Sequence, residues 1–315
     1  MSQKSYNQFW LEGLVPAVFT PFQEDGELNL SKIDEYCEFL LKNNIKAVFV
    51  NGTTGEGKSM TKEERKIVAE KWIFTASGRL KVVVNVSGLN VRESIELAKH
   101  AVHIRADAIA CLPPLFFKPN SIESLVDHCK MVADAAPSLP FYYYHLPAMT
   151  GVELKMEDFL ITAKNKIPNM TGLKFASKDL GDLIGCLFAG KFNILCGCDE
   201  QLMGNLVMGA HGAVGTLYNF MPQVFHRLLQ HLSNGEMEMA REEQIRAQKV
   251  LRLMLKHGHS LGGNVAAVKP MMALVGLDLG PPRHPMRPMT VDELIDFQRD
   301  VDLIGFKDWN PANFL

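Results

Sequence analysis

The sequence predicts an α/β fold, a (β/α)8 TIM barrel with an appended C-terminal helical bundle. Eight short apolar segments, each followed by a stretch with helical spacing, fall within residues 1–221. Near-continuous apolar strands are typical of a parallel sheet that is buried on both faces, and eight such units favour a closed barrel over an open sheet. No Gly-x-Gly-x-x-Gly sequence opens the first expected helix, so the signature of a dinucleotide-binding sheet is missing.

The expected strands and helices alternate along the chain. We expect strands at residues 14–22, 47–51, 82–86, 108–112, 140–147, 170–177, 193–197 and 212–218. Residues 61–64 (TKEE) have the form of a capping box and predict a helix that begins there. Residues 222–315 have helical spacing over more than the length of one barrel helix. We expect residues 1–221 to form the barrel that carries the active site, and residues 222–315 to pack on it rather than fold independently.

Composition and charge exclude several classes of partner. The chain is 47% hydrophobic and 22% charged, as is typical of a soluble globular protein. Its net charge of −2 gives no basic surface, so we expect no nucleic-acid partner. No apolar run reaches the length of about 18 residues that a membrane span needs, and residues 1–10 lack a signal-peptide pattern. Scattered cysteines inside apolar segments are typical of a reducing compartment, so we expect a cytoplasmic protein with no membrane partner.

The cysteines and histidines predict no metal site. Cys196 and Cys198 are separated by one residue, a spacing that suits neither a zinc knuckle nor a redox pair. The ten histidines contain no HExxH pattern, and His257 and His259 would lie on different faces of a helix.

A lysine inside an apolar strand is the first indication of chemistry. In residues 170–177 (MTGLKFAS), strand alternation turns Lys174 away from Leu173 and Phe175. A strand lysine often lies on a solvated face, but the preceding strand (PFYYYHLP) carries Tyr144 near its end. In one parallel barrel the amine and the phenol could meet in one pocket. An amine in a low-dielectric pocket is a better nucleophile toward a carbonyl, which favours a Schiff-base aldolase.

Polar residues also follow the other expected strands. Each has an ordinary structural explanation: a threonine pair suits a turn, and two acidic residues suit the first turn of a helix. In a barrel, however, the C-terminal ends of the strands share one rim, where the active site lies. We therefore expect these side chains to converge on one site: Thr53, Thr54, Tyr144, Lys174, Asp199, Glu200 and Thr216.

Five segments resemble the signature segments of the dihydrodipicolinate synthase / N-acetylneuraminate lyase superfamily. They occur in the order that the superfamily has, from about Leu14 to the C-terminal helices. Within it, the chain resembles the N-acetylneuraminate (sialic acid) lyases most. The segments are residues 51–57 (NGTTGEG), 144–151 (YHLPAMTG), 172–175 (GLKF), 197–200 (GCDE) and 209–219 (GAHGAVGTLYN).

The resemblance implies a role for each residue of the set. Lys174 would form a Schiff base with the C2 ketone of sialic acid or pyruvate, and Tyr144 would donate and accept the proton as the C3–C4 bond breaks. Thr53 and Thr54 would hold the carboxylate of the substrate. The hydroxyls of the distal chain would be bound by the Gly197 carbonyl, Asp199, Glu200 and Thr216. No metal or organic cofactor is implied, and the expected assembly is a homotetramer.

Four positions depart from related patterns. The lyase pattern has a hydroxyl at position 176, where this chain has Ala176; Ser177 comes next and is expected on the opposite strand face. Phe116 and Phe117 occupy positions at which related enzymes supply a tyrosine. Met149 stands where synthases have an arginine, and a thioether cannot form a bidentate ion pair with a carboxylate.

Two alternatives stay open beside cleavage of N-acetylneuraminate to pyruvate and N-acetylmannosamine. One is another pyruvate-dependent aldolase or a dihydrodipicolinate synthase, against which Met149 and the acidic pair of residues 199–200 argue. The other is a catalytically weak relative that binds a sugar acid without cleaving it. Ala176 supports that alternative, whereas Lys174 and Tyr144 oppose it.

Overall fold

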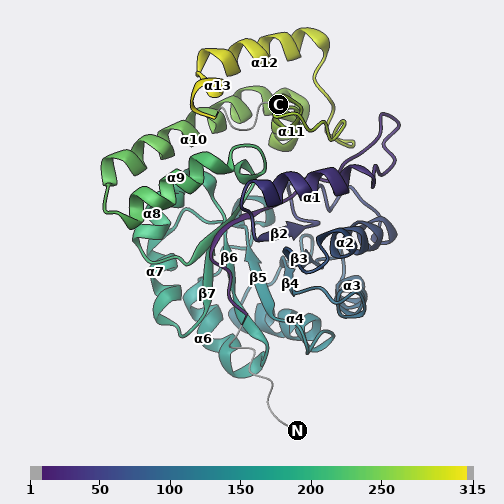
Figure 1. The fold of residues 1–315 in the computed structure, drawn as a ribbon. Helices are drawn as coiled ribbons and strands as arrows, with labels where there is room; N and C mark the ends of the chain where they lie inside the picture. Colours follow the sequence, from purple (N-terminus) through teal and green to yellow (C-terminus); the bar gives the residue numbers. More distant parts are fainter. Residues whose placement is uncertain (1–8, 311–315) are drawn as a thin grey trace.

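Eight parallel strands form one sheet that closes into a barrel (Figure 1). The computed structural model describes residues 9–310. The strand order is β1-β8-β7-β6-β5-β4-β3-β2, and the bridge between Ala17 and Phe49 joins the β1 and β2 edges. The predicted (β/α)8 class is therefore confirmed. The strands are β1 (Gly13–Pro16), β2 (Ala47–Val50), β3 (Lys81–Asn85), β4 (Ala108–Cys111), β5 (Phe141–His145), β6 (Met170–Phe175), β7 (Asn193–Cys196) and β8 (Gly212–Gly215).

Helices surround the barrel and continue beyond it. The capping box is confirmed: the Thr61 side chain accepts from the Glu64 N–H, and the Glu64 carboxylate accepts from the Thr61 N–H. The α-helices are α1 (Lys32–Lys42), α2 (Lys62–Ala76), α3 (Val91–His103), α4 (Ile122–Asp134), α5 (Pro147–Thr150), α6 (Met156–Lys166), α7 (Leu180–Phe188), α8 (Leu202–Val207), α9 (Pro222–Ser233), α10 (Met237–Gly258), α11 (Asn264–Leu274), α12 (Val291–Leu303) and α13 (Phe306–Trp309). Short 3-10 turns are η2 (Asp199–Gln201), η3 (Leu217–Asn219) and η4 (His259–Leu261).

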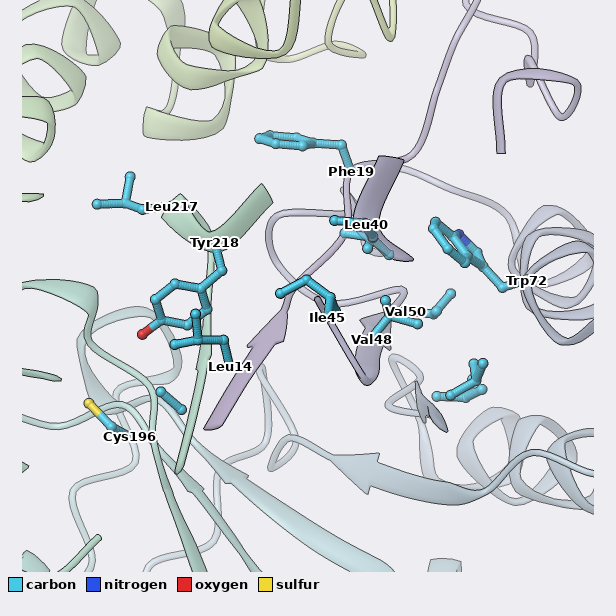
Figure 2. Packing of buried hydrophobic residues seen from close by; sticks show 14 of the residues in the cluster. Leu14, Phe19, Leu40, Ile45, Val48, Val50, Trp72, Cys196, Leu217 and Tyr218 are labelled. Atoms are coloured by element: carbon cyan, nitrogen blue, oxygen red, sulfur yellow. The ribbon is translucent and has the colours of Figure 1, made fainter. Parts of the chain in front are cut away.

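Strand alternation divides the core into two layers. Val15 and Phe49 belong to a small cluster inside the barrel, whereas Leu14 and Val48 belong to a larger cluster between strands and helices. Figure 2 shows part of the outer layer, with Trp72 and the β2 side chains turned toward it. Because both faces of the sheet are buried, the strand sequences are mostly apolar rather than alternating between apolar and polar residues.

All eight expected strands end beyond the observed ones, and the excess is largest at β1 and β8. β1 ends at Pro16 and β8 ends at Gly215. After β8 the chain turns into η3, so Thr216 lies just beyond the strand. An apolar run alone does not tell a ladder from a buried turn, which explains both overestimates.

The C-terminal helices lie across one end of the barrel (Figure 1). Helix α10 packs on α9 and α11, and its residues line the same cavity as the strand ends. The expected C-terminal helices are therefore present, and the division into two units at residue 221 stays a prediction. Across residues 9–310, no helix combines the length and the apolar character that crossing a membrane requires.

Candidate active site

The eight residues predicted for the site line one cavity. Its volume is about 1540 Å³, and the C-terminal helices contribute part of its wall. The predicted convergence on one rim is confirmed; the role of each residue is still a prediction. The lining includes Thr53, Thr54, Tyr144, Lys174, Gly197, Asp199, Glu200 and Thr216.

Lys174 and Tyr144 are neighbours across two adjacent strands. They are paired in the β5–β6 register, and Lys174 is 4% exposed. The Lys174 Nζ lies 4.1 Å from the centre of the Tyr144 ring and 4.5 Å from the centre of the Phe49 ring. Leu173 and Phe175 lie in the outer layer, so the expected direction of Lys174 is confirmed. Aromatic faces attract an ammonium group and therefore help to hold this amine in place.

Four hydroxyl groups from the ends of three strands are joined in pairs. The Tyr144 hydroxyl lies 3.2 Å from the Thr53 Oγ1, within hydrogen-bond distance. The Thr54 Oγ1 lies 2.7 Å from the Thr216 Oγ1. These contacts connect the β2–α2 loop to β5 on one side and to the end of β8 on the other.

The β2–α2 loop is suited to bind an anion. Within residues 9–310, the backbone N–H groups of Thr53, Thr54 and Gly55 have no hydrogen-bond acceptor. The two threonines line the cavity. Consecutive free N–H groups in a turn are a common way to bind carboxylate or phosphate.

Asp199 holds the end of β8 as well as facing the cavity. Its Oδ2 accepts hydrogen bonds from the N–H groups of Thr216 and Leu217, each at 2.9 Å. Its Oδ1 is buried, and no group in residues 9–310 donates to it with hydrogen-bond geometry. Burial raises the pKa of the Asp199 carboxyl from 3.8 to about 6. One oxygen thus stabilises the turn, and the other is buried beside Gly215 and Tyr218.

A residue from α10 supports this turn, and no local sequence pattern predicts it. The Gln244 Nε2 donates to the Asp199 carbonyl at 3.0 Å, and its Oε1 accepts from the Met203 N–H at 2.9 Å. Gln248, one helical turn further on, lines the cavity directly. Gln244 lies more than forty positions from the turn that it supports, and both glutamines belong to an amphipathic helix with no recognisable motif.

The expectation that Ser177 points away from the site is wrong. β6 ends at Phe175, so Ala176 and Ser177 follow the strand, and both line the cavity. Alternation holds only while the chain stays in the ladder. The Ser177 Oγ accepts from the Asp179 N–H at 3.2 Å, which keeps this hydroxyl at the rim.

The side chains at the other departures are exposed, and of these Met149 lines the cavity. Met149 in α5 lines the cavity and is 68% exposed. Phe116 and Phe117 are 84% and 86% exposed, and neither is among the described residues of the lining. Across the described residues, no three histidine, cysteine, aspartate or glutamate side chains gather as a metal site requires.

Comparison with known proteins gives consistent matches over nearly the whole chain. The model of the Dihydrodipicolinate synthetase family matches residues 10–303. The chain is 43% identical to the N-acetylneuraminate lyase of Mus musculus over 286 residues, which cover 89% of this chain and 88% of the mouse protein. It is 40% identical to the N-acetylneuraminate lyase of Homo sapiens over 312 residues, which cover 96% of each chain.

A solved structure gives the same likeness in three dimensions. Proteus mirabilis N-acetylneuraminate lyase superposes on this chain with a TM-score of 0.90 and 35% sequence identity. The superposition covers 95% of this chain and 100% of that chain.

Proposed function

The chain belongs to the dihydrodipicolinate synthetase family, and on this premise we propose that it is an N-acetylneuraminate lyase. It would cleave N-acetylneuraminate to pyruvate and N-acetylmannosamine through a Schiff base on Lys174. The observation that carries the proposal is the pairing of the Lys174 amine with Tyr144 at the base of a large polar-rimmed cavity. The names of the similar proteins support the same substrate.

The first step joins the substrate to Lys174. The amine attacks the C2 ketone of the open-chain sugar acid, water leaves, and a protonated imine forms. The free N–H groups and hydroxyls of Thr53 and Thr54 bind the neighbouring carboxylate. Within residues 9–310 no acidic side chain pairs with Lys174, so its amine is free to meet a carbonyl carbon.

The second step breaks the C3–C4 bond. Tyr144 gives its own proton to the hydroxyl that leaves as water in the first step, and the resulting phenolate takes the proton of the C4 hydroxyl. The aldehyde then leaves, and the bonding electrons move into the imine to give an enamine. Tyr144 then returns the proton to C3, and water hydrolyses the imine to release pyruvate and the free amine. The Thr53 hydroxyl, 3.2 Å from the phenol oxygen, orients Tyr144 for both transfers.

The far wall of the cavity recognises the rest of the sugar. Asp199 and Glu200 present carboxylate oxygens, which accept hydrogen bonds from a polyol. Gly197 and Thr216 lie beside them on the same wall. Ligand pockets usually measure about 300–1,000 Å³, so a cavity of about 1540 Å³ supports a substrate far larger than pyruvate. Met149 at the mouth cannot grip a second carboxylate, which disfavours synthase chemistry.

Pyruvate release from two substrates tests the proposal. We expect rapid cleavage of N-acetylneuraminate and much slower cleavage of short 4-hydroxy-2-oxo acids, which lack the polyol chain. Borohydride reduction in the presence of pyruvate is expected to leave one adduct, on the tryptic peptide of Lys174. Equal or faster cleavage of the short acid would leave only a general aldolase. Trapping at Lys174 without cleavage of either substrate would indicate a sugar-acid-binding relative, with Ala176 as the first suspect.

Assembly, compartment and domain division are part of the same proposal. The assembly is proposed as a homotetramer because the family resemblance implies one. The compartment is proposed as the cytoplasm, which the six free cysteines support, five of them buried. Residues 222–315 are proposed as helices that depend on the barrel, since Lys269 of α11 is buried against Thr20. Light scattering of the purified chain would measure the assembly; a monomer would contradict that part of the proposal.

A further inference from the structure

Glu56 occupies a backbone conformation that disfavours its own side chain. Its φ is 53°, in the left-handed region, between Gly55 and Gly57. Side chains other than glycine rarely adopt this region because Cβ approaches the following carbonyl oxygen. Such strain is kept where surrounding contacts hold it, often at functional sites. The contacts of the Glu56 carboxylate therefore indicate which part of the structure depends on this conformation.

The Glu56 carboxylate is fully buried and bound to the C-terminal helices. Its Oε1 lies 3.1 Å from the Lys269 Nζ, and the exposed fractions of the two side chains are 0% and 1%. Its Oε2 accepts the Arg283 N–H at 2.8 Å. Lys269 belongs to α11, more than two hundred positions further along the chain.

Lys269 also binds the backbone on both sides of this pair. Its Nζ donates to the Thr20 carbonyl at 2.9 Å and to the Pro281 carbonyl at 2.8 Å, and it lies 4.5 Å from the centre of the Phe22 ring. The amine thus has three oxygen acceptors and an aromatic face. It is fixed in one position.

The pair is connected to the anion-binding loop by short bonds. The Thr20 Oγ1 donates to the Gly55 carbonyl at 2.6 Å. The Glu56 N–H donates to the Thr53 carbonyl at 3.0 Å. Both contacts orient peptide groups next to the free N–H groups of Thr53 and Thr54. A shift of Lys269 would therefore move the atoms that are proposed to hold the substrate carboxylate.

We propose that Lys269 and Glu56 are positioning residues that hold the β2–α2 loop in its carboxylate-binding form. The inference rests on the proposed function, because it takes the loop to bind the carboxylate of a 2-oxo acid. A buried ion pair is a poor source of stability compared with apolar residues of the same volume. It does fix geometry, because each partner must stay where the other one is.

Imine trapping with two carbonyl probes tests the proposal. Pyruvate carries a carboxylate and acetone does not, and each can condense with the Lys174 amine with loss of water. Borohydride then adds hydride to the imine carbon. The variants are Glu56→Gln, Lys269→Met and the double variant. The pyruvate concentration for half-maximal trapping is expected to rise on the order of tenfold or more, while acetone trapping stays within about twofold of the wild type.

A second ion pair provides the matched control. Arg227 of α9 and Glu243 of α10 are joined at 2.8 Å, and Glu243 is largely buried. We expect Arg227→Met and Glu243→Gln to leave the ratio of pyruvate to acetone trapping unchanged, even where they lower the melting temperature. If Lys269→Met does not fold, Glu56→Gln and the double variant, which leave no unpaired buried carboxylate, carry the test.

The outcomes separate the two proposals. Equal losses for pyruvate and acetone, or no loss for either, would overturn the positioning role. A wild-type protein that does not trap pyruvate at Lys174 would overturn the positioning role and the proposed function together. Trapping by the wild type with an unchanged ratio in the variants would overturn the positioning role alone.

Discussion

Two walls of the cavity differ in how their side chains are held. The lysine wall consists of Lys174 and Tyr144, which both contact the Phe49 ring, and the carboxylate wall consists of Asp199, Glu200 and Thr216. The lysine wall lies on strands, where the β5–β6 ladder fixes the register. The carboxylate wall lies on turns that follow β7 and β8, and hydrogen bonds from side chains to the backbone hold it.

The difference assigns chemistry and recognition to separate parts of the barrel. Strand positions are rigid, which suits groups that must meet a reacting atom within a fraction of an ångström. Turns after strands vary without disturbing the ladder, which suits groups that select a substrate. Changes in the lysine wall should therefore abolish turnover, whereas changes in the carboxylate wall should alter substrate preference.

Loss of the amine should have the largest effect. Lys174→Met keeps the volume of the side chain but cannot form an imine, so we expect turnover and pyruvate trapping to disappear. Lys58 is the matched control: it lines the same cavity, and burial lowers the pKa of its amine to about 8. Lys58→Met should keep trapping at Lys174. Peptide mapping of the reduced adduct identifies the lysine that forms the imine. An adduct on Lys58 would contradict the assignment of imine formation to Lys174.

Loss of the phenol should have the next largest effect. Tyr144→Phe keeps the ring over Lys174 but removes the proton-transfer group, so kcat should fall by roughly 10²–10⁴ while pyruvate trapping survives. Tyr142 lies on the same face of β5 and donates to Asn193 instead. Tyr142→Phe should therefore change kcat far less. Steady-state kinetics of both variants decide the point; equal losses would make Tyr144 a packing residue.

Titration of Asp199 in the carboxylate wall should make the stability of the protein depend on pH. The folded-state pKa of Asp199, about 6, lies above the ordinary value of 3.8, so the folded protein holds this proton more tightly than the unfolded chain does. The stabilisation is fully present below about pH 4 and is lost as pH rises through about 6.

Comparison with Asp199→Asn, which does not titrate, isolates this effect. Between pH 4 and pH 6.5 the wild type should lose about 2 kcal/mol of unfolding free energy relative to the variant. Urea unfolding at several pH values measures it. A difference that is constant with pH, or that grows in favour of the wild type, would show that the Asp199 carboxyl is not desolvated.

Removal of one recognition charge should have the smallest effect. Glu200→Gln weakens hydrogen bonds to the polyol chain, each worth about 1.5–3 kcal/mol when the acceptor is charged. We expect kcat/KM for N-acetylneuraminate to fall by about tenfold to a hundredfold, with pyruvate trapping nearly unchanged. Kinetics with the long and the short substrate make the comparison. A loss of pyruvate trapping would place Glu200 in the lysine wall's chemistry instead.

The sequence alone determined the fold class and the residues of the lysine wall. Apolar runs alternating with helical spacing predicted eight strands because burial on both faces leaves a local pattern. Lys174 stood out for the same reason, since a charge inside such a run needs a partner or a function. Tyr144, near the end of the neighbouring strand, was predicted as the partner of Lys174 in the same pocket.

Only the tertiary structure decided how the site is supported. It turned Ser177 into the cavity because β6 ends two residues earlier, and it gave Asp199 a second task at the end of β8. It also brought Gln244 and Lys269 to loops that lie far away along the chain. A contact between distant segments leaves no periodicity in either one, so side chains whose partners come from elsewhere in the fold cannot be read from local pattern.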